Sequence, residues 1–152
     1  MINTYIIDKE NNDVTNKLAN NYLKLISKQT RITENYIFNK DIVKAQKNSS
    51  ELAKKSYTIA LDKYIEPNSF NIILDESGKD LSSEEFAEVL VHPKINFFIG
   101  GAFGFEKEFL KRANLKLSMS KMTFTHTMAK LFLYEQIYRG FCIQNNHPYH
   151  KV

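Results

Sequence analysis

Residues 95–104 read Ile95-Asn96-Phe97-Phe98-Ile99-Gly100-Gly101-Ala102-Phe103-Gly104, a run of strand-forming side chains that ends in a loop with three glycines. The residues that follow, 105–112, favour a helix. Glycine lets a backbone approach a ligand closely, and ligands of open α/β sheets bind at the carboxyl ends of the strands. The loop is therefore either a ligand-binding loop or a turn that has no room for side chains.

Two common nucleotide-binding motifs do not fit this loop. A dinucleotide-binding fingerprint needs an acidic residue about 20 residues further on to hold a ribose. No acid lies between Glu108 and Glu135. A phosphate-binding loop needs Gly-Lys-Ser or Gly-Lys-Thr, which this loop lacks. A small oxidoreductase that uses a nicotinamide nucleotide is therefore disfavoured.

Strand-like and helix-like patterns alternate along the whole chain. Ser82 and Glu85, for example, form a capping box that begins a helix. The patterns predict strands at 4–7, 36–38, 70–75, 95–99 and 115–119, helices at 14–26, 52–63, 82–90, 105–112 and 125–141, a turn at 77–79, and a polar stretch at 40–50 that is a mobile connection or a frayed helix start. We therefore predict an α/β fold, a mostly parallel sheet with helices on both faces, in a single domain over residues 1–152.

Composition excludes several classes of protein. Of the 152 residues, 43% are hydrophobic and 25% are charged, which is typical of one globular domain. No run of about 18 apolar residues predicts a membrane helix. The first residues lack the basic segment of a signal peptide, and the single cysteine, Cys142, cannot form an internal disulfide, so we expect a cytoplasmic protein without membrane attachment. Cys142, His147 and His150 lack a standard zinc spacing, so no metal site is predicted.

Charge is distributed unevenly along the chain. Residues 1–99 carry 13 Lys and Arg against 14 Asp and Glu, a net charge of −1. Residues 100–152 carry 8 against 3, a net charge of +5. A basic third of the chain suggests a polyanion such as nucleic acid as partner, although a solvated basic surface would have the same composition.

Polar, aromatic and basic side chains are concentrated near the C-terminus. The tail reads Asn145-Asn146-His147-Pro148-Tyr149-His150-Lys151 and follows a helical segment with Glu135 and Arg139. Such side chains suit contacts to RNA bases by stacking and to phosphates by charge. Two other interpretations remain open: Glu135 and Arg139 can form an ion pair within the helix, and the histidines can be ordinary surface residues.

Three segments together resemble one family of enzymes. The first is Ile73-Leu74-Asp75 with Gly78-Lys79, and the second is the glycine loop after Phe98-Ile99. The third begins with Leu117-Ser118-Met119-Ser120-Lys121-Met122-Thr123-Phe124. It continues with the helix Glu135-Gln136-Ile137-Tyr138-Arg139 and the ending His147-Pro148-Tyr149-His150-Lys151. Their order and spacing are similar to the RlmH-type bacterial 23S rRNA pseudouridine N3-methyltransferases of the SPOUT superfamily. The first 69 residues fit only by length and by the order of strands and helices.

The resemblance implies a C-terminal trefoil knot and a homodimer. It also implies S-adenosylmethionine as methyl donor. The acceptor would be the N3 atom of a pseudouridine in the helix 69 loop of 23S rRNA, in the large subunit or the assembled ribosome, during ribosome maturation. A non-catalytic RNA- or ribosome-binding knot protein that has lost donor binding is the alternative.

The family's motifs assign functions to individual residues of this chain. The donor pocket falls on Leu74, Gly100, Met119, Ser120, Lys121, Met122, Thr123 and Phe124. The substrate side falls on Arg139, Tyr149, His150 and Lys151, with Glu135 orienting Arg139 or supporting the dimer. In the homodimer that the resemblance implies, the last helix and tail of one chain lie across the two-fold axis from the donor bound to the partner. Phe132, Tyr138 and Phe141 are candidate interface residues.

The chemistry of methyl transfer to a ring nitrogen suggests what three of these residues do. The donor and acceptor must be aligned, and the nitrogen must lose a proton. Arg139 suits stabilisation of the resulting anion, because a guanidinium stays protonated. His150 is a candidate proton acceptor, or Tyr149 stacks on the base while water takes the proton. Arg139, Tyr149 and His150 are the predicted catalytic residues, and the reaction requires no metal.

Overall fold

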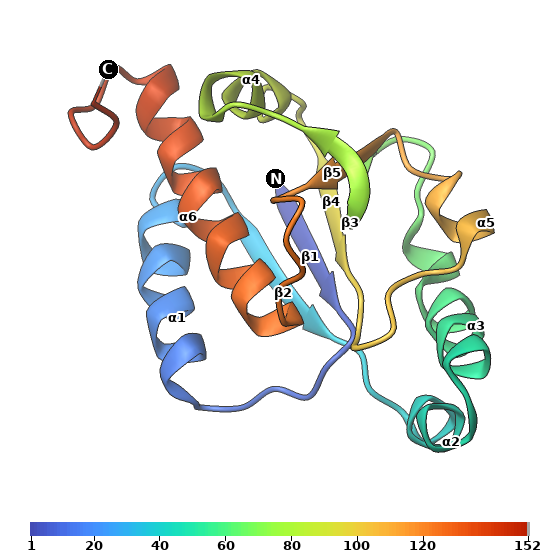
Figure 1. The fold of residues 1–152 in the computed structure, drawn as a ribbon. Helices are drawn as coiled ribbons and strands as arrows, with labels where there is room; N and C mark the ends of the chain where they lie inside the picture. Colours follow the sequence, from blue (N-terminus) through green and yellow to red (C-terminus); the bar gives the residue numbers. More distant parts are fainter. Residues whose placement is uncertain (152) are drawn as a thin grey trace.

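The computed structural model describes residues 1–151 as a five-stranded sheet with helices on both faces (Figure 1). Val152, the last residue of the predicted domain, lies outside the described residues. The strands are β1 (Ile2–Ile6), β2 (Ile32–Tyr36), β3 (Phe70–Asp80), β4 (Ile95–Ile99) and β5 (Leu115–Ser118). The helices are α1 (Val14–Ile26), α2 (Lys40–Asn48), α3 (Ser50–Leu61), α4 (Ser83–Val89), α5 (Lys107–Leu110) and α6 (His126–Gln144), with a short 3-10 helix at Asp62–Tyr64.

The strands lie in the order β2-β1-β4-β3-β5, and every neighbouring pair is parallel. All five strands therefore run in the same direction, as expected when helices connect them, and β1, β2 and β4 end at the same edge of the sheet (Figure 1). The predicted parallel α/β sheet is confirmed. Because β4 lies at the centre, the glycine loop that follows it opens at the middle of this edge.

Successive side chains of the strands pack into two separate cores. Ile95, Phe97 and Ile99 of β4 pack with buried residues of α1, α4 and α6. Phe98 points to the other face and packs with buried residues of α2, α3 and α5. Burial on both faces explains why four of the five residues of β4 are large and hydrophobic, and its one polar residue, Asn96, is buried as well.

The predicted turn at 77–79 is wrong, because these residues belong to β3. The strand bulges outward after Leu74 and rejoins β5 at Lys79, so that both residues pair with Leu117. Gly78 makes this return possible: a Cβ atom at Gly78 would lie 2.7 Å from the backbone carbonyl carbon of Leu117. The bulge moves the residues between Leu74 and Gly78 out of the plane of the ladder.

Replacing Gly78 by alanine should destabilise the fold by about 1–3 kcal/mol, because the new methyl group meets strand backbone that cannot move aside. Urea denaturation followed by circular dichroism measures this loss. Ser77→Ala, an exposed change in the same bulge, is the control and should cost less than about 1 kcal/mol. Equal stability of Gly78→Ala and the wild type would contradict the close approach of β3 and β5.

Other boundaries differ from the predictions in instructive ways. The polar stretch at 40–50 is mostly an ordered helix, α2, in which Asn39 caps the first turn and Ile42 is fully buried. β2 ends at Tyr36, where the predicted strand begins, although the Ile37 N–H still donates to the Ile6 carbonyl oxygen. The helix predicted at 105–112 is the single turn of α5. Helices α2 and α5 each bury one side chain and β2 buries none, which is too weak a pattern to recognise in the sequence.

Candidate active site

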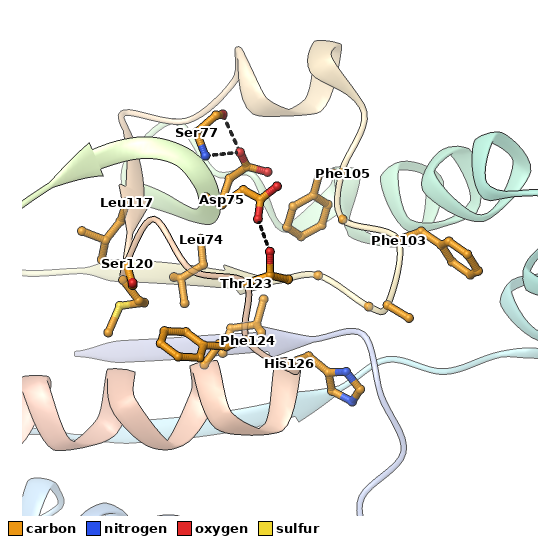
Figure 2. A pocket seen from close by; sticks show the side chains of 18 of the residues that line it. Leu74, Asp75, Ser77, Phe103, Phe105, Leu117, Ser120, Thr123, Phe124 and His126 are labelled. Carbon is orange, nitrogen blue, oxygen red and sulfur yellow. Dashed lines mark hydrogen bonds between the residues drawn. The ribbon is translucent and has the colours of Figure 1, made fainter.

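A cavity of about 360 Å³ opens at the carboxyl end of β4 and the bulge of β3, beside the segment 119–125 that joins β5 to α6 (Figure 2). Its volume is in the range of small-molecule sites. Apolar side chains, including Leu74, Phe105 and Leu117, line it together with a few polar ones and the glycine loop. Ligands of parallel α/β sheets bind at this edge.

Seven of the eight residues predicted to bind the donor line this cavity. They are Leu74, Gly100, Met119, Ser120, Met122, Thr123 and Phe124. The eighth, Lys121, is exposed and is not among the lining residues. The fold thus brings three separate sequence segments together around one space, and the assignment of a ligand to it stays a prediction.

Hydrogen bonds hold the segment 119–125 in place as one wall of the cavity. The Ser118 hydroxyl donates to the Ser120 carbonyl oxygen at 2.9 Å, and the Met122 N–H donates to the Ser120 hydroxyl oxygen at 3.0 Å. The Thr123 hydroxyl donates at 2.8 Å to the Glu76 carboxylate in the β3 bulge, as Figure 2 shows. The bulge and this segment therefore form one continuous rim.

Glycine occupies three positions of the loop, for a different structural reason at each. Gly104 has a positive φ of 72°, which side chains disfavour. A Cβ atom at Gly101 would lie 2.8 Å from the hydroxyl oxygen of the buried Tyr57, so packing alone requires glycine there. A Cβ atom at Gly100 would lie 3.1 Å from the ring of Phe105, at the wall of the cavity. The steric interpretation of the loop therefore holds for two glycines, and Gly100 remains the candidate for ligand approach.

If the cavity binds S-adenosylmethionine, as the resemblance implies, Gly100→Val should abolish that binding while the fold is retained. The branched side chain would press on the Phe105 ring and occupy space at the cavity wall. Isothermal titration calorimetry measures the affinity, and circular dichroism checks the fold. An affinity within about tenfold of the wild type, or 1.4 kcal/mol, would show that the loop is only a turn.

A polar pair at the edge of the cavity is not apparent from the sequence. His126, the first residue of α6, lines the cavity, and its Nε2 lies 2.8 Å from the Asp8 carboxylate. Both side chains are mostly buried. Asp8 follows β1 closely, and an acid at the carboxyl end of a central strand is the signal that could have identified it.

The C-terminal tail forms a second cluster at the other end of α6. Glu135 accepts hydrogen bonds from Arg139 Nε and from the Tyr149 hydroxyl, both at 3.0 Å. The Arg139 guanidinium lies 4.8 Å from the centre of the Tyr149 ring, and the Tyr22 hydroxyl of α1 lies 3.4 Å from that of Tyr149. The ion pair within the helix is therefore present, and it also anchors the tail.

His150 is hydrogen-bonded at both ring nitrogens. Its Nδ1 lies 3.3 Å from Arg139 Nη1, and its Nε2 lies 3.0 Å from the Glu84 carboxylate of α4. Because arginine can only donate, Nδ1 is the acceptor, and the Nε2–H of His150 donates to Glu84. Both ring nitrogens are therefore engaged in hydrogen bonds within the chain.

Burial and hydrogen bonding determine the charges in the tail cluster. Burial, together with hydrogen bonds to Tyr22 and Glu135, raises the pKa of Tyr149 well above that of a free phenol. The hydrogen bond with Glu135 raises the pKa of Arg139. Tyr149 therefore stays a neutral hydrogen-bond donor and Arg139 a cation, so the phenol cannot act as a base near neutral pH.

Helix α6 keeps the two clusters apart within one chain. His126 lines the cavity at its start, and Arg139 follows thirteen residues later, roughly 20 Å along the helix axis. Figure 1 shows the tail at the end of α6 that is remote from the carboxyl ends of β1, β2 and β4. The structure does not bring Arg139, Tyr149 and His150 together with the cavity of their own chain.

An apolar groove of about 260 Å³ lies next to the cavity, between α4, the end of β5 and α6. Its apolar lining includes Leu81, Phe86, Met119, Phe124 and Phe132. Phe132 is 41% exposed although it is a large hydrophobic residue, and its ring centre lies 5.2 Å from that of Phe124. Exposed apolar surface of this kind is typical of a protein interface.

Neither a membrane span nor a cluster of metal ligands is found among residues 1–151. No helix in this range is both long and apolar enough to cross a membrane. No three His, Cys, Asp or Glu side chains of the same residues are grouped closely enough to hold a metal ion.

Comparison with known proteins gives a consistent result along the whole chain. Residues 1–150 match the family described as "Predicted SPOUT methyltransferase". A Campylobacter lari protein named ribosomal RNA large subunit methyltransferase H is 50% identical over 151 residues, with 99% of each chain covered. Proteins of the same name from Sulfurovum sp. and Campylobacter jejuni subsp. jejuni are 43% and 45% identical, again with 99% of each chain covered. The resemblance seen in the sequence is confirmed: this chain belongs to the SPOUT methyltransferase family, together with the ribosomal RNA large subunit methyltransferases H that it resembles.

Proposed function

We propose that this protein transfers a methyl group from S-adenosylmethionine to ribosomal RNA of the large subunit, at N3 of a pseudouridine in the helix 69 loop of 23S rRNA. The names of its relatives support the rRNA substrate. The observation that carries the proposal is the cavity at the carboxyl end of β4 and the bulge of β3, which gathers seven of the eight family-matched donor residues in a chain of the SPOUT family. The reaction would take place in the cytoplasm, on the large subunit or the assembled ribosome.

The residues of the cavity fit S-adenosylmethionine in chemistry as well as in size. The side chains of Leu74, Phe105 and Leu117 offer apolar surface to an adenine ring. The Asp75 and Glu76 carboxylates suit hydroxyl groups and positive charge, both of which the donor carries. When bound, S-adenosylmethionine supplies a methyl group on a positively charged sulfur.

The tail cluster supplies the groups that the acceptor base requires. Arg139 bonds to Glu135 and His150 but has more N–H donors than these bonds use, so it can stabilise negative charge on the base. Tyr149 offers its ring for stacking on the base. His150 accepts the N3 proton only after its Nδ1 has been released from Arg139, and we propose that binding of the RNA draws Arg139 away.

The catalytic assignment requires a homodimer, because α6 separates each tail from its own cavity. In a two-fold dimer, the tail of one chain would complete the cavity of the partner. The apolar groove with the exposed Phe132 supports an interface near α6. The trefoil knot implied by the resemblance remains part of this proposal.

Sedimentation equilibrium should therefore give about twice the monomer mass of 17.7 kDa at micromolar concentration. Burial of the apolar groove between two chains would stabilise the dimer through the hydrophobic effect. A stable monomer that retains activity would contradict the shared site.

Mass spectrometry of 23S rRNA from cells with and without this gene tests the function directly. We expect loss of one methyl group from a pseudouridine in the helix 69 loop when the gene is deleted, and its return when the gene is restored. Unchanged modification would overturn the proposal. Calorimetry with S-adenosylmethionine adds a second test: heat with a defined stoichiometry supports the enzyme, whereas its absence supports a non-catalytic RNA-binding protein.

A further inference from the structure

The cavity is lined by four charged or titratable side chains, of which one has no partner among residues 1–151. Asp75 and Glu76 come from β3, His126 from α6 and Lys54 from α3. The first three each have a hydrogen bond to a neighbouring side chain. For the Lys54 ammonium, no hydrogen bond or ion pair is found within the same range. A lysine of the cavity wall is thus left without an anion.

The position of Lys54 is set by the packing of α3. Ala53 and Tyr57 are fully buried on the face of α3 that meets the sheet, and Tyr57 lies directly against Gly101 of the glycine loop. Lys54 follows Ala53 and is partly buried, whereas its neighbour Lys55 is exposed. An anionic ligand in the cavity would give the Lys54 ammonium a hydrogen-bond acceptor and a counter-charge.

We propose that Lys54 binds the carboxylate of the amino-acid end of S-adenosylmethionine, an inference that rests on the function proposed above. The carboxylate is the anionic group of this donor, whose sulfonium and ammonium groups are cationic. The wall formed by the β3 bulge carries Asp75 and Glu76, which would repel a carboxylate.

Repulsion by that wall favours one orientation of the donor. Its carboxylate would point away from β3 and toward α3, while its cationic and hydroxyl groups lie on the acidic side. In Figure 2, Asp75 belongs to the β3 bulge, whereas Phe103 lies on the side of the green-blue helices. The cavity wall thus carries a positive side chain, Lys54, on α3 and negative ones, Asp75 and Glu76, on β3. We infer that this polarity selects a zwitterionic ligand over a nucleoside of the same size.

The test compares two ligands and three forms of the full-length chain by isothermal titration calorimetry. The ligands are S-adenosylmethionine and decarboxylated S-adenosylmethionine, which lacks only the carboxylate. The proteins are the wild type, Lys54→Met, which keeps the apolar stem, and Lys55→Met as the matched control on the exposed side of α3. Lys54→Met should weaken S-adenosylmethionine at least about tenfold and the decarboxylated ligand less than about twofold.

The pair of ligands distinguishes a lost carboxylate contact from a folding defect. A folding defect in Lys54→Met would weaken both ligands alike, so an equal loss overturns the inference. If Lys54→Met binds S-adenosylmethionine as well as the wild type does but binds RNA more weakly, the inference is also overturned. Lys54 would then be assigned to a phosphate of the RNA instead. Failure of the wild type to bind either ligand would overturn the proposed function itself. Lys54→Arg, which keeps the charge, should retain most of the affinity for S-adenosylmethionine.

Discussion

Deletion of residues 149–152 should lower methyl transfer to 23S rRNA at least about a hundredfold and leave the affinity for S-adenosylmethionine nearly unchanged. The deletion removes the Tyr149 ring and the His150 imidazole from the tail cluster. It removes no residue that lines the cavity. Transfer of a labelled methyl group to rRNA measures the first quantity, and calorimetry measures the second.

Two point variants make this prediction more specific. Arg139→Ala should have the same effect as the deletion, because Arg139 supplies the fixed positive charge of the cluster. Lys116→Ala, an exposed basic change on β5, is the control and should cost little. Loss of Lys151 in the truncated chain should also reduce the log–log salt slope of RNA binding by roughly 0.7–0.9 if it contacts one phosphate. Full methylation by the truncated protein would show that the tail is an ordinary solvated segment.

Mixing two inactive variants should restore activity. Gly100→Val damages the cavity and leaves the tail intact, whereas Arg139→Ala damages the tail and leaves the cavity intact. If the tail of one chain serves the cavity of its partner, each heterodimer contains one site built from two intact halves. Random exchange of subunits should then yield about a quarter of the wild-type activity, since half of the dimers carry one working site of two.

The measurement is the methylation rate of co-expressed variants that carry different affinity tags, so that heterodimers are isolated directly. Purified heterodimers should be about half as active as the wild type. No recovery in confirmed heterodimers would mean that each chain completes its own cavity, and the separation of tail and cavity by α6 would then have to be bridged in another way.

Local signals in the sequence predict most of the architecture. The hydrophobic run of β4 marks a strand buried on both faces, and the capping box at Ser82 and Glu85 is present at the start of α4. Both depend on residues that are close in the sequence, where periodicity and capping are informative. The alternation of such elements is sufficient to predict a parallel sheet.

Features that depend on distant contacts could not be predicted. The bulge of β3 looks like a turn in the sequence, because Gly78 lies among polar residues and its contact with Leu117 is invisible there. The pairing of His126 with Asp8 joins residues 118 positions apart in the sequence. The same is true of the candidate site. Motifs identify its residues, but the hydrogen bonds of both His150 ring nitrogens are seen only in the folded structure.

The length of α6 also affects how activity should respond to dilution. A helix of 19 residues carries the tail away from the cavity of its own chain, so the proposed shared site would exist only while two chains are associated. Turnover per chain should then fall when the enzyme is diluted below its dissociation constant, as the dimer population declines by mass action. In a cell, the number of copies of this protein would therefore set its specific activity as well as its total activity.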